Sequence, residues 1–330
     1  MLNKRIIGRL GNQMFQYAAV RAFQEKYAKD DQINIDFSDT FQYLDKGNRP
    51  DLLDFKIKKC KLTPAKKTIT QKIILKYLYF RKVLYFIIAK INPKKNYDQR
   101  YYEYEKKIQP KLNKHGIYSM NHGYTEMANS KVKNKIFIGT FESPKYFEDI
   151  RDILLEEFTP KWNVIGSNEK FLKDIQTTES VCVSIRRGDF VEDPKARGRF
   201  YVCKPSYFKD AVKRMKKEVK NAKFFIFSDD IEWCKNNLDF FPKGTQFEPL
   251  ENPVYEKLRL MYNCKHFIIS NSTFSWWAQF LSRNEKKIVI APKVWRNNTY
   301  HHECYGGNID IYEKGWILID NINTKEKNGK

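Results

Sequence analysis

The sequence has little glycine and proline and no long uncharged apolar run. Fourteen glycines and twelve prolines among 330 residues exclude a collagen-like or low-complexity chain. With 42% hydrophobic and 15% aromatic residues, the chain can bury a core and is not intrinsically disordered. No stretch matches the roughly 20 apolar residues that a transmembrane helix needs. The length fits two domains better than one, and two domains create a cleft between them.

Motifs for metal binding and for several common chemistries are also missing. The six cysteines, at positions 60, 182, 203, 234, 264 and 304, include no Cys-x-x-Cys pair, which excludes zinc fingers and leaves separate reduced thiols. The sequence holds no His-Glu-x-x-His and no Asp-x-Asp, and we expect no metal and no other cofactor. The absence of a Gly-x-Ser-x-Gly elbow and of a Walker lysine argues against serine hydrolases and P-loop enzymes.

Acidic residues are few relative to basic ones, 39 against 61, so the formal net charge is +22. This excess predicts a polyanionic partner: nucleic acid, an anionic membrane surface or a phosphorylated substrate. Residues 56–100 hold fourteen basic residues and one acid, Asp98. Apolar residues recur there at helical spacing, which predicts an amphipathic helix that either packs on its own domain or lies in an anionic membrane interface. The N-terminus has no apolar signal core, so we expect a cytoplasmic protein, peripheral on the inner face of the cytoplasmic membrane in the second case.

The first half of the chain predicts a small parallel sheet. A strand at residues 4–7 breaks at a glycine turn, and a helix follows at 14–29, with Asn12 placed to cap it. The turn lacks the Gly-x-Gly-x-x-Gly spacing of dinucleotide folds. A second strand at 33–36 is expected to pair parallel with the first through a right-handed crossover. Further expected elements are strands at 117 and 135–139, a helix at 145–158 and a connection between domains at 159–179.

The second half alternates strands and helices regularly, which predicts a doubly wound parallel sheet. The pattern begins at residues 181–185, whose small, mostly β-branched side chains suit a strand that is buried on both faces. We therefore predict an α/β protein with domains at 1–160 and 161–330. The later expected elements are helices at 206–219, 231–237, 254–264 and 275–281, and strands at 223–227, 266–270 and 287–291.

Three strand ends of the second half finish in polar residues, which meet at one edge of a parallel sheet. The first carries Arg186, Arg187 and Asp189. Two guanidinium groups suit a bidentate grip on a phosphate or carboxylate, although a structural Arg–Asp ion pair at a turn gives the same pattern. The third end opens a helix, whose first N–H groups and hydroxyls stabilise an anion, with a plain N-cap as the alternative. The second and third ends hold Ser228, Asp229 and Asp230, and Asn271, Ser272, Thr273, Phe274 and Ser275.

Five blocks of the sequence, in order, resemble the signatures of the glycosyltransferase family 11 α-1,2-fucosyltransferases. They are residues 8–18 (GRLGNQMFQYA), 139–147 (GTFESPKYF), 185–190 (IRRGDF), 228–233 (SDDIEW) and 270–277 (SNSTFSWW). The resemblance runs nearly end to end, down to residues 315–317, and residues 56–135 carry no block. One departure is Ser184, where family members often have histidine, so any acid or base role of that imidazole is in doubt here.

This resemblance implies a GT-B-like fold, in which two Rossmann-like domains face each other across a cleft. The N-terminal domain is then the acceptor side, and the C-terminal domain binds GDP-fucose. The implied reaction is a metal-independent, inverting transfer of L-fucose to the 2-hydroxyl of a galactose. The acceptor would be an oligosaccharide or lipid-linked glycan of the surface-polysaccharide or O-antigen type. Two alternatives remain open: an enzyme for another nucleotide sugar or another fucose linkage, and a basic protein that binds nucleic acid or an anionic membrane.

The resemblance also implies roles for single residues. Arg186 and Arg187 act with Asp189 in catalysis, and the diphosphate is expected at Arg187 or at both arginines. The polar residues of the second and third strand ends bind the donor. From the first domain, Gly11, Asn12 and Gln13 face the sugar. The sequence singles out no general base, and the candidates by position alone are Asp189, Asp36 and Glu142.

Overall fold

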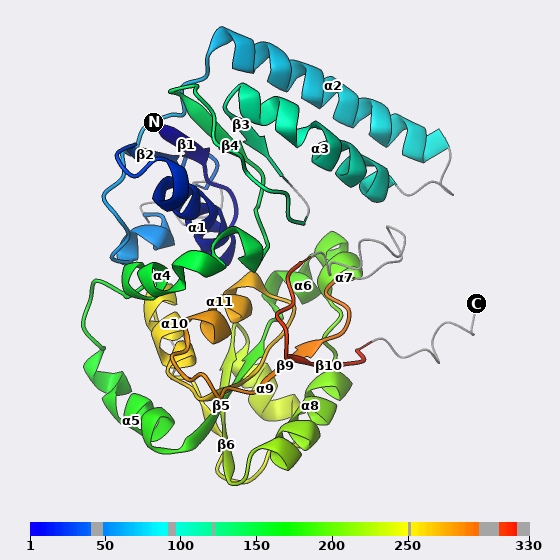
Figure 1. Ribbon diagram of the computed structural model, residues 1–330. Helices are drawn as coiled ribbons and strands as arrows, with labels where there is room; N and C mark the ends of the chain where they lie inside the picture. The colour runs from blue at the N-terminus through cyan, green and yellow to red at the C-terminus, as the bar shows by residue number, and fades with distance from the viewer. Residues whose placement is uncertain (41–48, 92–96, 121–122, 250–251, 297–309, 322–330) are drawn as a thin grey trace. The chain divides into compact units, whose positions relative to one another are not determined.

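Two parallel sheets organise the chain, and each belongs to its own compact unit (Figure 1). The computed structural model describes residues 1–40, 49–91, 97–120, 123–249, 252–296 and 310–321. The first unit comprises Met1–Glu157 together with Asp310 and Ile311, and the second holds the other described residues from Phe158 onwards. The sequence placed the domain boundary between residues 160 and 161.

The sheet of the first unit has four strands, in the order β2-β1-β4-β3, and every neighbouring pair is parallel. Helix α1 joins β1 to β2, and the long basic segment with α2 and α3 joins β2 to β3. The strands and main helices of this unit are β1 (Leu2–Arg5), α1 (Leu10–Tyr27), β2 (Ile33–Asp36), α2 (Ile69–Ile91), α3 (Tyr97–Lys114), β3 (Ile117–Ser119), β4 (Lys135–Ile138) and α4 (Arg151–Glu157).

Helix α1 begins four residues earlier than the sequence indicated, because the chain turns at Gly8 and not after it. Gly8 has a φ of 79°, in the left-handed region that glycine adopts without strain. Arg9 is then the N-cap, and its carbonyl accepts the backbone N–H of Gln13 at 3.0 Å. The predicted cap at Asn12 is therefore wrong, since Asn12 lies inside the first turn of the helix.

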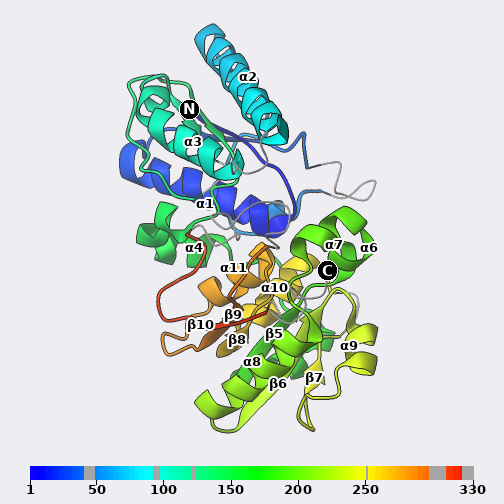
Figure 2. The same cartoon turned by 90° about the vertical axis from the view of Figure 1, so that its right-hand side faces the viewer.

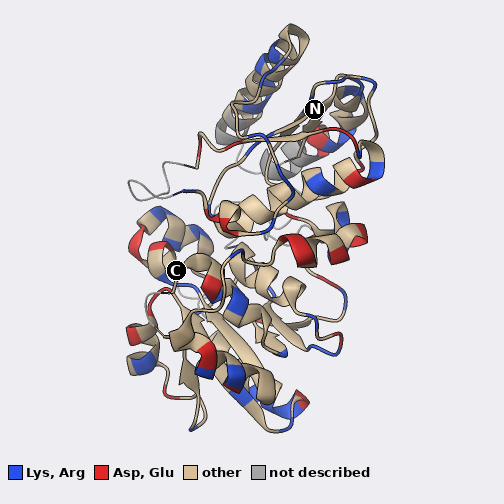
Figure 3. Ribbon diagram, turned by 90° about the vertical axis from the view of Figure 1, so that its left-hand side faces the viewer, with Lys and Arg blue, Asp and Glu red and all other residues tan. Residues whose placement is uncertain are grey.

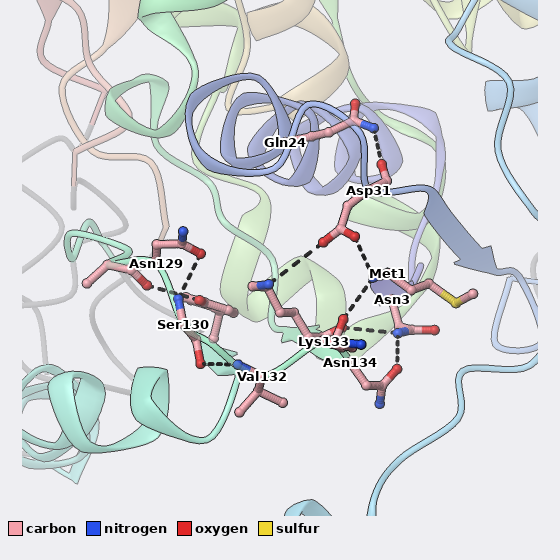
Figure 4. Close-up of polar contacts among 12 residues, drawn as sticks. Met1, Asn3, Gln24, Asp31, Asn129, Ser130, Val132, Lys133 and Asn134 are labelled. Atoms are coloured by element: carbon pink, nitrogen blue, oxygen red, sulfur yellow. Dashed lines mark hydrogen bonds and ion pairs between the residues drawn. The ribbon is translucent and has the colours of Figure 1, made fainter.

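Buried amides tie the start of β1 to β4 and β2. The Asn3 side chain donates to the Asn134 side chain at 2.8 Å and to the Lys135 carbonyl at 3.1 Å (Figure 4). It also accepts a hydrogen bond from the Asn34 side chain at 3.0 Å. Each of these groups is polar and shielded from water, so the bonds remove the cost of burying them and fix the order of the central strands.

The basic segment folds mainly as two adjacent helices, α2 and α3, which contact each other. The amphipathic helix expected in it is confirmed as α2, whereas α3, which contains Pro110, was not predicted. The inner face of α2 packs through the buried Leu78 against Leu112 of α3 and Ile136 of β4. Within the described part of the chain, no helix combines the length and the apolar character that crossing a bilayer requires.

Two expectations around the middle of the chain need correction. The helix predicted at 145–158 is broken into two short 3₁₀ helices, η3 (Pro144–Tyr146) and η4 (Glu148–Ile150), before α4, because the backbone at Phe147 leaves the helical region. The segment expected to connect the domains contains the 3₁₀ helix η5 (Gly166–Asn168) and helix α5 (Glu169–Thr177). Phe171 and Ile175 are buried one helical turn apart, which explains why α5 forms there.

The second unit is a six-stranded parallel sheet in the order β10-β9-β8-β5-β6-β7, which confirms the predicted α/β class (Figure 2). Its core joins β5, β6 and β8 to α8, through apolar side chains such as Val183, Ile226 and Met215. How the two units face each other stays a prediction. The elements are β5 (Glu179–Ile185), α6 (Gly188–Glu192), α7 (Pro194–Phe200), α8 (Pro205–Glu218), β6 (Ala222–Ser228), α9 (Ile231–Asn237), β7 (Gln246–Phe247), α10 (Val254–Tyr262), β8 (His266–Ile268), α11 (Thr273–Leu281), β9 (Val289–Pro292) and β10 (Ile317–Ile319).

Candidate active site

The strand order of the second unit reverses direction next to β5. From β5 the chain moves outward through β6 to β7, and then returns to the other side of β5 to add β8, β9 and β10. In open parallel sheets, such a reversal leaves a crevice beyond the carboxyl ends of the two strands that flank it, and ligands bind there. By this rule, a ligand is expected beyond β5 and β8, the strands whose ends carry the arginine pair and the serine-rich turn.

Arg186 is held between two carboxylates. Its guanidinium group forms ion pairs with Asp189, one turn further along the chain, and with Asp229 at the end of β6. Its guanidinium carbon also lies 5.5 Å from the centre of the Phe190 ring. Both terminal nitrogens of Arg186 are engaged, so this guanidinium is fixed and largely neutralised.

The backbone N–H and the Nε of Arg187 are held by neighbouring carboxylates, whereas its two terminal nitrogens are not engaged by the described residues. Its backbone N–H donates to Asp229 at 2.8 Å, and its Nε donates to Asp230 at 3.1 Å. The guanidinium carbon lies 3.4 Å from the centre of the Trp233 ring, in cation–π contact. Within the described residues, the two terminal nitrogens of Arg187 have no hydrogen-bond partner. The side chain is only 13% exposed, so its guanidinium group is held in place, and its two terminal nitrogens are N–H donors that no described residue engages.

Asp229 and Asp230 have all four carboxylate oxygens engaged by the protein. Asp229 accepts from the Arg187 backbone and faces Arg186, while Asp230 faces Arg187 and caps α9 by accepting the Trp233 N–H at 3.2 Å. The Ser228 hydroxyl accepts the Asp230 N–H at 3.0 Å. The carboxylates that follow β6 thus hold the arginines that follow β5. The alternative interpretation of the sequence pattern, a structural Arg–Asp ion pair at a turn, is confirmed for the contacts between these residues.

The third strand end is joined to β5 by hydroxyl groups. The Ser184 and Ser275 hydroxyls lie 2.6 Å apart, and the Ser270 hydroxyl lies 3.3 Å from Ser275. Ser272 is the N-cap of α11 but makes no side-chain cap bond. The Asn271 amide is engaged within the protein, since it donates to the Phe200 and Trp295 carbonyls at 2.9 Å each. Ser184 is thus a buried hydroxyl within this cluster.

The first unit has a strand reversal of its own. From β1 the chain adds β2 on one side and later places β4 on the other, so the crevice lies between the Gly8 turn and the loop after β4. Gln13 is buried and shapes this turn: its amide donates to the Gly8 carbonyl at 3.0 Å and accepts the Leu52 N–H at 3.3 Å. Gly11 is buried in the first turn of α1, and Asn12 is half-buried there.

Of the base candidates, Asp36 and Asp189 are engaged with neighbours. Asp36 accepts hydrogen bonds from Ser38 and from the Ala65 N–H; burial alone would raise its pKa, but these bonds hold the pKa below its ordinary value. Asp189 pairs with Arg186. Glu142 is half-buried in the loop after β4 and belongs to the first unit.

Sequence reasoning missed several residues around these two edges. Lys4 in β1 is buried, and its ammonium donates to the Arg5 and Gly139 carbonyls at 2.7 and 3.0 Å. Burial lowers the pKa of Lys4 to about 7, against an opposing effect of Asp39. In the second unit, Lys257 of α10 donates to the Ser228 carbonyl at 3.0 Å and pairs with a buried glutamate. A lysine in a short polar strand is usually exposed, so only the packing of the folded unit shows that the Lys4 side chain is buried.

Among the described residues, no group of three or more His, Cys, Asp or Glu side chains is placed to hold a metal ion. Residues 1–320 match the sequence signature of glycosyl transferase family 11. The chain belongs to this family. It is therefore a glycosyltransferase, and its two sets of signature blocks lie at the strand reversals of its two sheets.

The names of the relatives of this family 11 transferase include two different transferred sugars, colitose and fucose. An alpha-1,2-colitosyltransferase of Escherichia coli is 32% identical over 88% of this chain and 91% of its own length. The O-antigen biosynthesis glycosyltransferase WbnK of Escherichia coli is 29% identical over 87% and 92%. The galactoside 2-alpha-L-fucosyltransferase Sec1 of Mus musculus is 26% identical over 47% and 44%. Among solved structures, the fucosyltransferase NodZ from Bradyrhizobium is similar over 85% of this chain and 92% of its own, with 10% identity and a TM-score of 0.46.

Proposed function

We propose that this transferase moves L-fucose from GDP-fucose to the 2-hydroxyl of a galactose on a glycan acceptor, with inversion and without a metal. The observation that carries the proposal is Arg187, whose terminal N–H groups have no partner among the described residues and which follows β5 at the strand reversal of the second unit. The fucosyl and the α-1,2 parts are supported by the family and by the galactoside 2-alpha-L-fucosyltransferase among the relatives.

The leaving diphosphate is the group that needs this arginine. As the bond between sugar and diphosphate breaks, negative charge builds on the nucleotide, and donors that are already oriented stabilise it without reorganisation. We assign the diphosphate to Arg187, with the N-terminus of α11 as a second source of N–H donors. Arg186, whose terminal nitrogens are both engaged, then keeps Asp189 and Asp229 in place.

The carboxylates take a different role in this proposal from the one the resemblance implied. Asp229 and Asp230 were expected to bind the donor, but their oxygens already accept from Arg186, Arg187 and the start of α9. We therefore assign them to orienting the arginines. In the first unit, the Gly8 turn with Gly11, Asn12 and Gln13 is assigned to the acceptor side.

A second candidate donor is favoured by a specific relative, the alpha-1,2-colitosyltransferase. Colitose differs from fucose in lacking the 3-hydroxyl, and a site that hydrogen-bonds a hydroxyl discriminates strongly against a sugar without it. The two donors are therefore separable by rate. Transfer assays with GDP-fucose and GDP-colitose over a panel of galactose-terminated acceptors decide between them, and NMR of the product reads the linkage.

Nucleotide selectivity tests the donor class independently of the acceptor. We expect GDP to raise the melting temperature, and UDP and CDP to leave it unchanged. A shift with UDP alone would contradict the proposed donor, and turnover with GDP-colitose but not GDP-fucose would replace the proposed sugar while keeping the nucleotide.

A further inference from the structure

Helix α2 turns large apolar side chains toward solvent. Ile69 and Ile91, at its two ends, are each 78% exposed, and Ile73 and Phe80 between them are each 63% exposed. Exposed patches of this kind on a folded domain mark interaction sites more often than chance. The outer apolar face, as we call it, consists of Ile69, Ile73, Tyr77, Tyr79, Phe80, Val83, Ile87 and Ile91.

Five of these residues form a stripe along one side of the helix, in which the exposed Lys76 also lies. Ile69, Ile73, Phe80, Ile87 and Ile91 are separated by four or seven positions, which places them on the same side of an α-helix. Over the 23 residues of α2 the stripe is roughly 35 Å long, at about 1.5 Å per residue.

The packing of α2 on its own unit does not use this stripe. The opposite side of α2 already packs on its unit, through the buried Leu78 and the half-buried Ile74 and Leu75 against residues of α3, β3 and β4. A surface helix normally buries its apolar face and exposes a polar one. Helix α2 is apolar on both sides, so its outer side calls for a partner other than its own core.

The charges around the stripe are all of one sign. Helix α2 contains no aspartate or glutamate, and Lys72, Lys76 and Lys82 are exposed on it. Lys66 and Lys67 are exposed just before the helix begins. Figure 3 shows this in colour: the topmost helix, α2 of Figure 1, carries blue positions and no red ones. A second copy of α2 would bring lysines against lysines, whereas an anionic surface complements them.

We propose that the outer apolar face of α2 docks this transferase on the surface of an anionic lipid bilayer, with the helix lying in the plane of the interface. Isoleucine, phenylalanine and tyrosine side chains insert at the level of the headgroups, while the lysines extend along the helix to lipid phosphates. The proposal is independent of which sugar is transferred, because it rests on α2 alone.

Vesicle co-sedimentation of the full chain tests this docking. We expect the protein to bind phosphatidylcholine vesicles that contain phosphatidylglycerol, to bind pure phosphatidylcholine weakly, and to release as salt is raised. The triple variant Ile73→Ser, Phe80→Ser and Ile87→Ser should lower the partition coefficient at least tenfold. The triple variant Lys72→Gln, Lys76→Gln and Lys82→Gln should lower it about a hundredfold, at roughly fivefold per lysine near the surface.

Matched variants on the second unit control for general changes in hydropathy and charge. Trp162, Val254 and Leu318 are exposed apolar residues there, and changing all three to serine should leave binding within twofold. Changing the exposed Lys213, Lys216 and Lys217 of α8 to glutamine should also leave vesicle binding within twofold. All the altered side chains are exposed, so unchanged melting curves are expected for every variant.

Three outcomes would overturn the proposal. They are no binding by the unaltered chain, equal binding to neutral and anionic vesicles, or full binding by both α2 variants. Light scattering after size exclusion addresses a second copy as the occupant. A dimer that the apolar α2 variant converts to monomer would assign the outer apolar face to self-association instead.

Discussion

The two sheets of this transferase are both parallel and both reverse their strand order, but they present different chemistry at the point of reversal. In the second unit, two guanidinium groups and three carboxylates meet beyond β5. In the first, the turn after β1 combines glycines and amides with one exposed arginine, Arg9, and Lys4 of β1 is buried with its ammonium on the Gly139 carbonyl.

The difference matches what each edge is proposed to hold. A diphosphate needs fixed cations, and the carboxylates around Arg186 and Arg187 hold those cations in position. An uncharged glycan needs hydrogen-bonding groups without net charge, which a turn of backbone and amide groups provides. If this comparison is right, substitutions at the second edge change catalysis, and those at the first change stability and its dependence on pH.

The largest effect is expected from Arg187→Ala. Losing one oriented donor to developing charge costs about 10²- to 10³-fold in rate, or roughly 3–4 kcal/mol. We expect kcat to fall by that factor and the GDP-induced melting shift to shrink, while the melting temperature without ligand stays unchanged. Arg187→Lys keeps the charge but loses the fork, so it should recover only part of the rate.

Arg214→Ala is the matched control, because Arg214 is an exposed arginine of α8 paired with Glu218. It should leave both rate and stability unchanged. Full turnover by a folded Arg187→Ala protein would show that the second edge does not hold the diphosphate, and the charge comparison would fail.

Lys4→Met probes the first edge through pH. Burial lowers the folded-state pKa of Lys4 to about 7, while the unfolded chain keeps the proton up to about the ordinary value of 10.5. Between these values the unfolded state holds more protons, so the stability contributed at this site rises with pH, by at most about 1.4 kcal/mol per unit. The unfolding free energy of the unaltered chain relative to Lys4→Met should therefore increase from pH 7 to pH 9.

Chemical denaturation at a series of pH values measures this difference. Lys131→Met, at an exposed lysine of the same unit, serves as the control and should give a difference that does not vary with pH. A flat difference for Lys4→Met as well would mean that the buried ammonium stays protonated in the folded chain.

Gly8→Ala tests the turn itself. A side chain at a φ of 79° costs about 1–2 kcal/mol, and a Cβ atom on Gly8 would lie 2.7 Å from the Asn12 amide nitrogen. We expect a lower melting temperature, with activity reduced only as far as Asn12 is displaced. Gly166→Ala is the control: a Cβ there meets nothing within 4 Å, so stability should hold or rise slightly. Equal effects of the two changes would remove the special role of the Gly8 turn.

The sequence could predict the chemistry at the strand ends but not the order of the strands. Alternating strands and helices put all carboxyl ends at one edge, so the local pattern alone predicts that Arg186, Ser228 and Ser270 gather there. The order in which strands pair depends on contacts between distant residues, such as Val181 with His266, which no local pattern encodes. The strand reversals are therefore a property of the folded sheets that the sequence pattern does not reveal. The expectation that ligands bind at these two edges depends on those reversals.

Local pattern also failed where a helix has no apolar rhythm or a buried group looks polar. Helices α6 and α7 bury none of their residues, so no periodicity predicted them. Lysine and asparagine are usually exposed residue types, yet Lys4 and Asn3 in β1 are buried. The stacking of Arg187 on Trp233 was likewise invisible, because the two residues belong to different elements.

The smallest expected effect lies in the neutral part of the second edge, at Ser184. Its hydroxyl lies 2.6 Å from that of Ser275, and both side chains are buried. Because Ser275 also has Ser270 at 3.3 Å, Ser184→Ala leaves no hydroxyl without a partner, and the cost should be about 1 kcal/mol. A double-mutant cycle of Ser184→Ala with Ser275→Ala measures the coupling between the two hydroxyls from melting curves. Because Ser184 carries no titrating group, the pH dependence of kcat should be the same in Ser184→Ala. A changed profile would show that this hydroxyl takes part in the proton transfer, and the second edge would then do more than bind the charged diphosphate.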